Sequence, residues 1–160
     1  MAQKLLLALD SSAGAWQAVE YVARTFGQTP EVEVTFLHIL AGLPPALWDD
    51  GHILDERERR SRQSLKANWQ QEQEKNWQHL VARAKDNLVA AGLPESAVSS
   101  RFKTKYFDVA EDIVNEAVNG GFSTIIMGRR GLGTAKSLLL GSVTNKVVQN
   151  SRGSAVTIVA

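Results

Sequence analysis

The chain alternates short apolar runs with longer amphipathic segments, and this alternation limits its fold more than any other feature. Five runs have the length and composition of buried strands. They are Lys4–Leu9, Val32–Leu40, Val98–Phe107, Thr124–Met127 and Ala155–Ala160. Strands that alternate with helices form parallel sheets, because right-handed crossovers place the helices on the sheet faces. The sequence therefore predicts one doubly wound, Rossmann-like α/β domain over residues 1–160, with a five-stranded parallel sheet and helices on both faces.

Capping residues mark where the helices between these strands begin. Ser11 or Ser12 can cap the first helix, and Ser142 opens the last one. Capping-box spacing opens the second and third helices, at Asp55/Glu58 and Asp108/Glu111. An apolar stripe predicts that the last part of the second helix is buried. It comprises Trp77, Leu80, Val81, Ala84 and Leu88.

Composition excludes several functional classes. The chain has no cysteine, so disulfides, thiolate catalysis and cysteine-bound zinc are excluded. Its three histidines lack the spacing of metal ligands, and no metal site is predicted. The net charge is +1, whereas nucleic-acid-binding proteins usually have a marked basic excess. No apolar stretch is long enough for a signal peptide core or a membrane span, and a cytoplasmic location is expected.

A glycine-rich segment, Gly128–Ser142, follows the fourth predicted strand and leads into a helix. Glycines allow the backbone to approach a ligand closely, and free N–H groups at a helix start favour an anion. The segment also carries Arg129, Arg130 and Lys136, which either contact that anion or are solvated loop charges. Neither the Walker A motif nor the Rossmann fingerprint is present, because the required lysine and glycine spacings are missing. The pattern nevertheless predicts a phosphate-binding loop.

The spacing of this loop resembles the ATP-binding branch of the universal stress protein family, with its signature G-x2-G-x9-G-[ST]. Gly128, Gly131, Gly141 and Ser142 fit the fixed positions. The resemblance extends along nearly the whole chain. It includes Asp10-Ser-Ser after the first strand, Leu-His-Ile at 37–39 and Thr-Ile-Ile-Met-Gly at 124–128.

The resemblance implies an ATP site, with Mg²⁺ accompanying the triphosphate. Asp10 would accept a hydrogen bond from the adenine amino group, and Ile39 would pack against the base. The ribose and phosphates would lie against a larger set of residues. These are Gly128, Arg130, Gly131, Gly141, Ser142, Val143 and Thr144.

Three functions remain open at this level. The first is a regulatory protein of the stress response that signals through ATP occupancy, with little or no turnover. The second is an enzyme that slowly hydrolyses ATP or transfers its phosphoryl group. No carboxylate or histidine in the loop is placed to orient a water molecule, so no catalytic residue is assigned. The third is a nucleotide-free interaction module on the same fold.

Two further expectations concern contacts between chains. The last predicted strand is apolar, and an uncharged edge strand tends to pair with another strand. The resemblance implies a homodimer through that strand. The segment Leu43–Asn76 is longer and more polar than the family's usual second crossover, and its helical part has few apolar residues. We expect its first half to project as a flap or partner-facing arm whose order depends on ATP, with Trp48 as its reporter.

Overall fold

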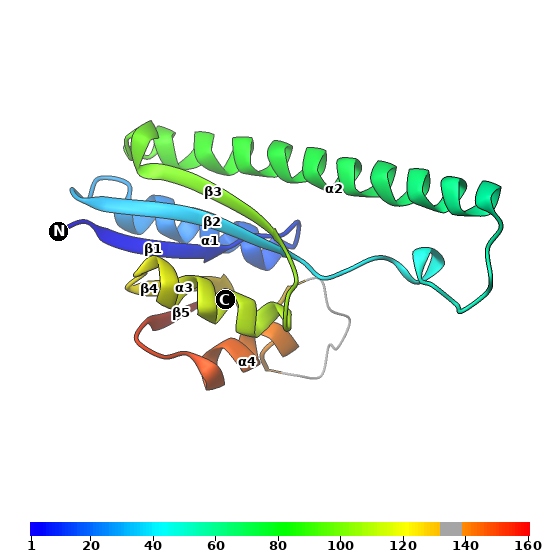
Figure 1. The fold of residues 1–160 in the computed structure, drawn as a ribbon. Helices are drawn as coiled ribbons and strands as arrows, with labels where there is room; N and C mark the ends of the chain where they lie inside the picture. The colour runs from blue at the N-terminus through cyan, green and yellow to red at the C-terminus, as the bar shows by residue number, and fades with distance from the viewer. Residues whose placement is uncertain (132–138) are drawn as a thin grey trace.

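The computed structural model describes residues 1–131 and 139–160, and its order of strands and helices is the predicted one (Figure 1). The strands are β1 (Gln3–Ala8), β2 (Val32–Leu40), β3 (Val98–Thr104), β4 (Thr124–Gly128) and β5 (Ala155–Val159). The α-helices are α1 (Ala13–Phe26), α2 (Glu56–Ala90), α3 (Val109–Gly120) and α4 (Ser142–Asn150). Two 3₁₀ turns, η1 (Pro45–Leu47) and η2 (Glu95–Ala97), lie in the connections.

The strands form one parallel sheet in the order β3-β2-β1-β4-β5. From β1 the chain builds outward through β2 to β3, and from β4 it builds in the opposite direction to β5. The direction of winding therefore reverses between β1 and β4, where the crevice of a doubly wound sheet lies. The predicted doubly wound α/β fold is confirmed.

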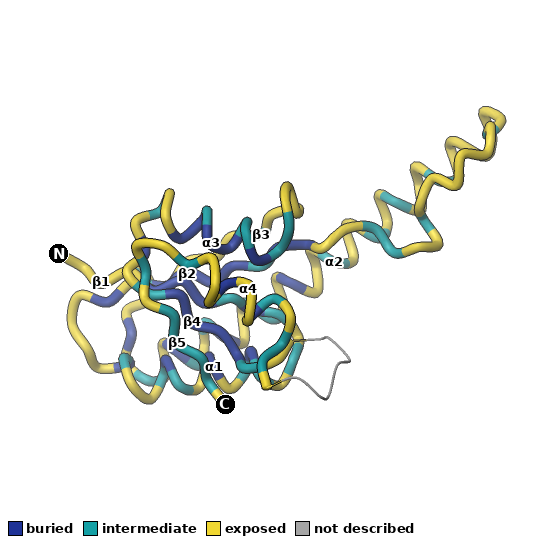
Figure 2. The backbone as a smooth tube through the Cα atoms, turned by 90° about the horizontal axis from the view of Figure 1, so that it is seen from below, coloured by how far each residue is buried: buried dark blue, intermediate teal, exposed yellow. Residues whose placement is uncertain are grey.

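Helices cover both faces of the sheet, and each face has its own core. On one face, Leu5 and Leu7 of β1 pack against α1 and the last part of α2. On the other face, Leu6 packs against α3 and α4. Successive residues of β1 are thus buried on opposite faces, which explains its continuous apolar run. Figure 2 shows the buried backbone between these layers.

The predicted helix starts are observed at α1, α2 and α3. Ser12 caps α1, and Asp55 forms a reciprocal capping box with Glu58 at α2. The side chain of Asp108 accepts a hydrogen bond from the N–H of Glu111 in α3. On α4, Val147 is buried, whereas the neighbouring Val148 is 41% exposed.

Strand β3 ends three residues before the predicted boundary at Phe107. Its last backbone hydrogen bond toward β2 is from the N–H of Lys105 to the carbonyl of Leu40, at 3.0 Å. The next two N–H groups, of Tyr106 and Phe107, donate to the carboxylate of Asp112 at 2.6 and 3.2 Å. A local side chain thus replaces the sheet partner and ends the strand.

The two edges of the sheet differ in charge. On β3, Arg101 and Lys103 form ion pairs with Glu116 of α3, which is 5% exposed. Burial alone raises the pKa of Glu116, but hydrogen bonds and charge from Lys103 and Arg101 hold it below its ordinary value. Strand β5, at the opposite edge, has no charged side chain. Charged side chains discourage edge pairing, so β5 is the edge better suited to pair with another strand.

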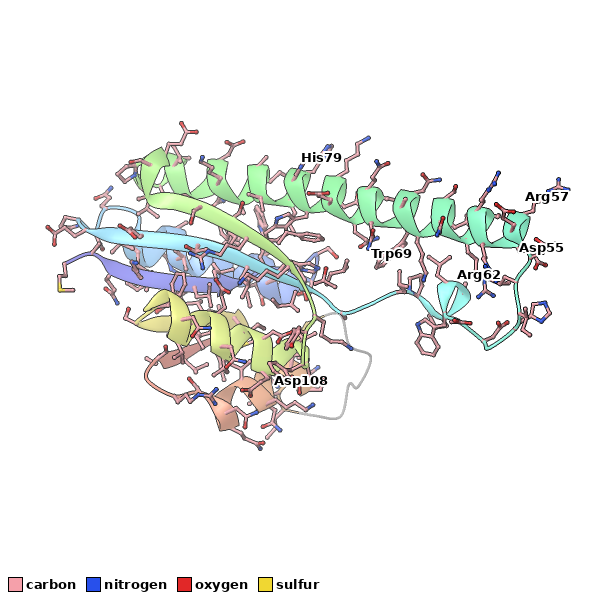
Figure 3. The ribbon with its side chains drawn as sticks, in the orientation of Figure 1. Asp55, Arg57, Arg62, Trp69, His79 and Asp108 are labelled. Carbon is pink, nitrogen blue, oxygen red and sulfur yellow. The ribbon has the colours of Figure 1, made fainter. Side chains whose placement is uncertain are left out.

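The first half of α2 extends beyond the sheet, as the sequence predicts (Figures 1 and 2). Trp77 is the first buried residue along this helix, and residues 56–76 are exposed or half-buried. The connection from β2 runs beside this part of α2, and Arg62 donates to the carbonyl of Trp48 at 3.3 Å. In Figure 3, Arg62 and Trp69 lie on the side of α2 that faces η1. We call residues 43–76 the arm.

Among residues 1–131 and 139–160, no helix is both long and apolar enough to cross a membrane.

Candidate functional site

A cavity of about 620 Å³ lies at the carboxyl ends of β1, β2 and β4, at the point where the winding reverses. This volume is in the usual range for small-molecule sites, about 300–1,000 Å³. All the candidate site residues named from the sequence line it. They are Asp10, Ile39, Gly128, Arg130, Gly131, Gly141, Ser142, Val143 and Thr144. Their role in binding a ligand stays a prediction, but the fold brings them around one space.

Asp10 follows β1 and lies between the start of α1 and the glycine loop. Its Oδ1 atom accepts a hydrogen bond from the N–H of Ser12 at 2.8 Å. A Cβ atom built on Gly131 would lie 3.1 Å from Oδ2 of Asp10. The second oxygen therefore lies close to the loop backbone, and it can accept one more hydrogen bond or contact a cation.

The start of α4 lacks a side-chain cap, unlike the starts of α1, α2 and α3. Gly141 is its N-cap residue and has no side chain to accept hydrogen bonds from the first turn. The N–H of Gly141 itself donates to the carbonyl of Arg129 at 2.9 Å, which fixes the loop against the helix. The first N–H with an acceptor in the helix is that of Asn145, which donates to the carbonyl of Gly141 at 2.9 Å. The N–H groups of Ser142, Val143 and Thr144 come before it and have no helical acceptor, so this end favours an anion.

Two polar side chains near this helix end hold the backbone in place. The hydroxyl of Thr144, which is buried, donates to the carbonyl of Gly128 at 3.1 Å. The Nε atom of Arg129 donates to the carbonyl of Leu139 at 2.7 Å. The hydroxyl proton of Thr144 is therefore already donated within the chain. Lys136, the third predicted cation of the loop, lies outside the described residues.

Close packing of backbone accounts for one signature glycine without any ligand. A Cβ atom built on Gly128 would lie 2.4 Å from the carbonyl carbon of Gly14 and 2.9 Å from the nitrogen of Ala15. Conversely, a Cβ atom on Gly14 would lie 2.4 Å from the carbonyl oxygen of Arg130. The first turn of α1 thus packs directly on the end of β4. This role of Gly14 was not predicted from the sequence, although a glycine in the first turn of a helix can indicate that another backbone segment packs closely there.

Gly141 is different, because alanine would fit at this position. Its φ of −63° is open to any residue. A Cβ atom there would lie 3.4 Å from the Cα of Arg130 and 3.5 Å from the nitrogen of Gly131, which are ordinary contacts. Packing within the described chain therefore does not require glycine at position 141.

The apolar wall of the cavity and its α2 side were not predicted. Val109, Ile113 and Met127 form part of the wall, and Gln73 enters from α2. His38 also lines the cavity, and its Nδ1 lies 3.0 Å from the carbonyl oxygen of Leu9. A carbonyl can only accept, so Nδ1 carries the proton. Residues this far apart in sequence give no local signal that they share a cavity.

Asp108 does not line the cavity, although it lies near α4 (Figure 3). A hydrogen bond from the N–H of Glu111, together with the nearby Lys146 ammonium at 3.5 Å, lowers the pKa of Asp108 below its ordinary value. Its carboxylate is thus engaged in capping α3. Among the described lining residues, Asp10 is the one carboxylate.

The sheet topology and this cavity together define a doubly wound α/β protein with a cavity of small-molecule size at its switch point. Residues 1–159 match the model of the universal stress protein family, and the chain belongs to that family. A curated relative is "Universal stress protein YxiE" of Bacillus subtilis (strain 168). It is 25% identical over 159 residues, which cover 94% of this chain and 95% of the relative.

Solved structures agree with this assignment. The hypothetical protein MJ0577, whose biochemical function was assigned from its structure, is 26% identical with a TM-score of 0.70; the match covers 99% of this chain and 96% of that one. A universal stress protein family member from Arabidopsis thaliana with AMP bound is 17% identical with a TM-score of 0.60, over 98% and 90% of the two chains. Structures of other universal stress proteins contain cAMP and, in Archaeoglobus fulgidus, dAMP.

Proposed function

We propose that this protein binds ATP in the cavity and acts as a regulatory protein that signals through nucleotide occupancy. The observation that carries the proposal is the uncapped start of α4 beside the glycine loop, in the same cavity as Asp10 and Ile39. Adenine nucleotides in solved universal stress proteins support it. In this arrangement, the phosphates lie at the first turn of α4 and the base lies toward β2.

Mg²⁺ would accompany the triphosphate in this proposal. The described residues contain no group of three or more carboxylate or histidine ligands that could hold a metal by themselves. Mg²⁺ usually keeps several waters and is bound through substrate phosphates and one or two carboxylates. In this proposal the carboxylate of Asp10 accepts a hydrogen bond from the adenine amino group, as the family resemblance implies, so the phosphates and water would hold the Mg²⁺ ion.

Purified protein is expected to bind Mg-ATP and to turn it over at less than about one per second, a rate below those of most dedicated enzymes. The physical reason is that Asp10 is the one carboxylate in the described cavity lining, and one of its oxygens already accepts a hydrogen bond from Ser12. Calorimetry measures binding, and a phosphate-release assay measures turnover. Absence of both binding heat and co-purified nucleotide would favour a nucleotide-free interaction module, and faster turnover would favour an enzyme.

A homodimer through β5 is also proposed. Strand β5 is an uncharged edge strand, whereas the opposite edge is protected by Arg101 and Lys103. Light scattering after size exclusion is expected to give twice the chain mass of 17.5 kDa. A monomer at micromolar concentration would contradict the pairing.

The arm, residues 43–76, is proposed to be a flap whose order depends on ATP, and a surface for a protein partner. Ala41 and Gly42 line the cavity and lead directly into the arm. Trp48 is 60% exposed, and its indole N–H donates to the carbonyl of Leu43 at 2.7 Å. A ligand that contacts the end of β2 would therefore restrain this connection.

Hydrogen exchange in the arm is expected to be fast without nucleotide and slower with ATP. Trp48→Phe should remove most of any ATP-dependent fluorescence change, while Trp16→Phe, on α1, should retain it. Equal protection with and without ATP would show that the arm is only a long crossover.

A further inference from the structure

Gln73 is the residue through which α2 reaches the cavity. It is the one described lining residue that comes from this helix, and its side chain is half-buried. Within residues 1–131 and 139–160, its carboxamide has no hydrogen-bond partner. A carboxamide carries both a donor and an acceptor, and at this half-buried position its polar atoms remain accessible to water or to a ligand. The group is thus available to a ligand in the cavity.

The position of Gln73 is fixed by the packing of Trp77, one turn further along α2. Residues four apart lie on the same face of a helix. Trp77 is 7% exposed, and its ring centroid lies 5.5 Å from that of His38 and 6.0 Å from that of Phe102. This aromatic cluster holds α2 against β2 and β3 at the point where the arm ends. Gln73, near the end of the arm, therefore lies one turn from a packed anchor that keeps this part of α2 beside the cavity.

Gln73 lies at the end of the cavity opposite the glycine loop. Helix α2 covers the β3 side of the sheet, whereas the loop and α4 lie at β4 and β5. Strand β1 separates β2 from β4, and neighbouring strands are about 4.8 Å apart, so the ends of β2 and β4 are about 10 Å apart. A nucleotide with its phosphates at α4 must extend across β1, which brings its base rather than its phosphates to Gln73.

We propose that Gln73 hydrogen bonds to the adenine base of the bound nucleotide and favours adenine over guanine. The inference rests on the proposed function of the same cavity. Adenine has an amino donor beside a ring-nitrogen acceptor, and the glutamine carboxamide matches this pair with two hydrogen bonds. The corresponding edge of guanine has two acceptors, of which the carboxamide can satisfy one. Helix α2 would thus take part in selecting the base, in addition to forming most of the arm.

The test compares ATP with purine riboside triphosphate, which lacks the amino group, in calorimetric titrations of wild type, Gln73→Ala and Gln70→Ala. Gln70 is the matched control, because it is an exposed glutamine one turn away that does not line the cavity. Both substitutions place alanine in a helix and should preserve the circular dichroism spectrum. The comparison shows whether the contribution of Gln73 to affinity depends on the amino group of the base.

Gln73→Ala is expected to weaken the binding of ATP about tenfold and the binding of the amino-free analogue only about threefold. The ratio of the two affinities, which favours ATP in the wild type, should therefore decrease. Gln70→Ala should keep both the wild-type affinities and their ratio. Equal weakening of both ligands by Gln73→Ala, or no weakening of either, would overturn the base contact while leaving ATP binding intact. Failure of the wild type to bind ATP would instead reject the proposed function, and the inference with it.

Discussion

Gly141→Ala is expected to weaken ATP binding ten- to a hundredfold while leaving the fold intact. A methyl group at this position would occupy the space between the start of α4 and the loop at Arg130 and Gly131. In the proposed complex, phosphate oxygens lie in that space and accept hydrogen bonds from the backbone. Hydrogen bonds to charged groups contribute about 1.5–3 kcal/mol each, and losing one of them accounts for the expected loss.

Calorimetric titration with Mg-ATP measures this effect, with circular dichroism as the check on folding. Asn145→Ala is the matched control, because Asn145 is an exposed residue of α4 that does not line the cavity. Gly131 is less suitable for this test, since a side chain there would press on Asp10, at 3.1 Å, as well as on the ligand. Unchanged ATP affinity in Gly141→Ala would argue against phosphates at the start of α4.

Gly128→Ala is expected to destabilise the protein by about 3 kcal/mol, the upper end of the usual cost of overpacking. The added Cβ would meet backbone atoms of Gly14 and Ala15 at 2.4–2.9 Å, far inside contact distance. The contact joins the backbone of β4 to the backbone of α1, and neither can move aside as a flexible side chain can. Either α1 must shift away from the end of β4, or β4 must shift within the sheet, and both changes disrupt buried packing on β1 and β4.

Urea denaturation measures this loss as a lower midpoint with an unchanged slope. Gly141→Ala is the control, because it is the same substitution at the other end of the glycine-rich segment and should cost no more than about 1 kcal/mol through its effect at the N-cap. Equal stability of the two variants would show that the contact between Gly14 and Gly128 is not rigid. The two variants together therefore test whether Gly128 is required for packing and Gly141 for the proposed ligand.

The glycines of the signature have different structural roles in this chain. From the sequence, Gly128 and Gly141 have equivalent places in a phosphate-binding pattern. In the structure, Gly128 permits contact between α1 and β4, while a Cβ atom at Gly141, beside an uncapped helix end, would make only ordinary contacts. Both glycines line the same cavity, but packing within the described chain requires glycine only at position 128.

The order of strands and helices, the caps and the buried face of α2 were predictable because each depends on neighbours within a few residues. A capping box needs only Asp55 and Glu58, and a helical stripe needs only residues three or four apart. The end of β3 was predicted incorrectly because Asp112, from the next helix, takes its N–H groups. The positions of the candidate site residues around one cavity agree with the sequence pattern and its family resemblance.

The sequence by itself thus determined a doubly wound α/β chain with a glycine loop at the carboxyl end of its fourth strand, because local periodicity and turn chemistry specify these features. Only the tertiary structure decided which residues meet across the switch point. Gly14 contacts Gly128, and Gln73 reaches the cavity because Trp77 packs on His38. Such contacts join residues tens of positions apart, and the close packing of side chains and backbone selects them only when the whole sheet has formed.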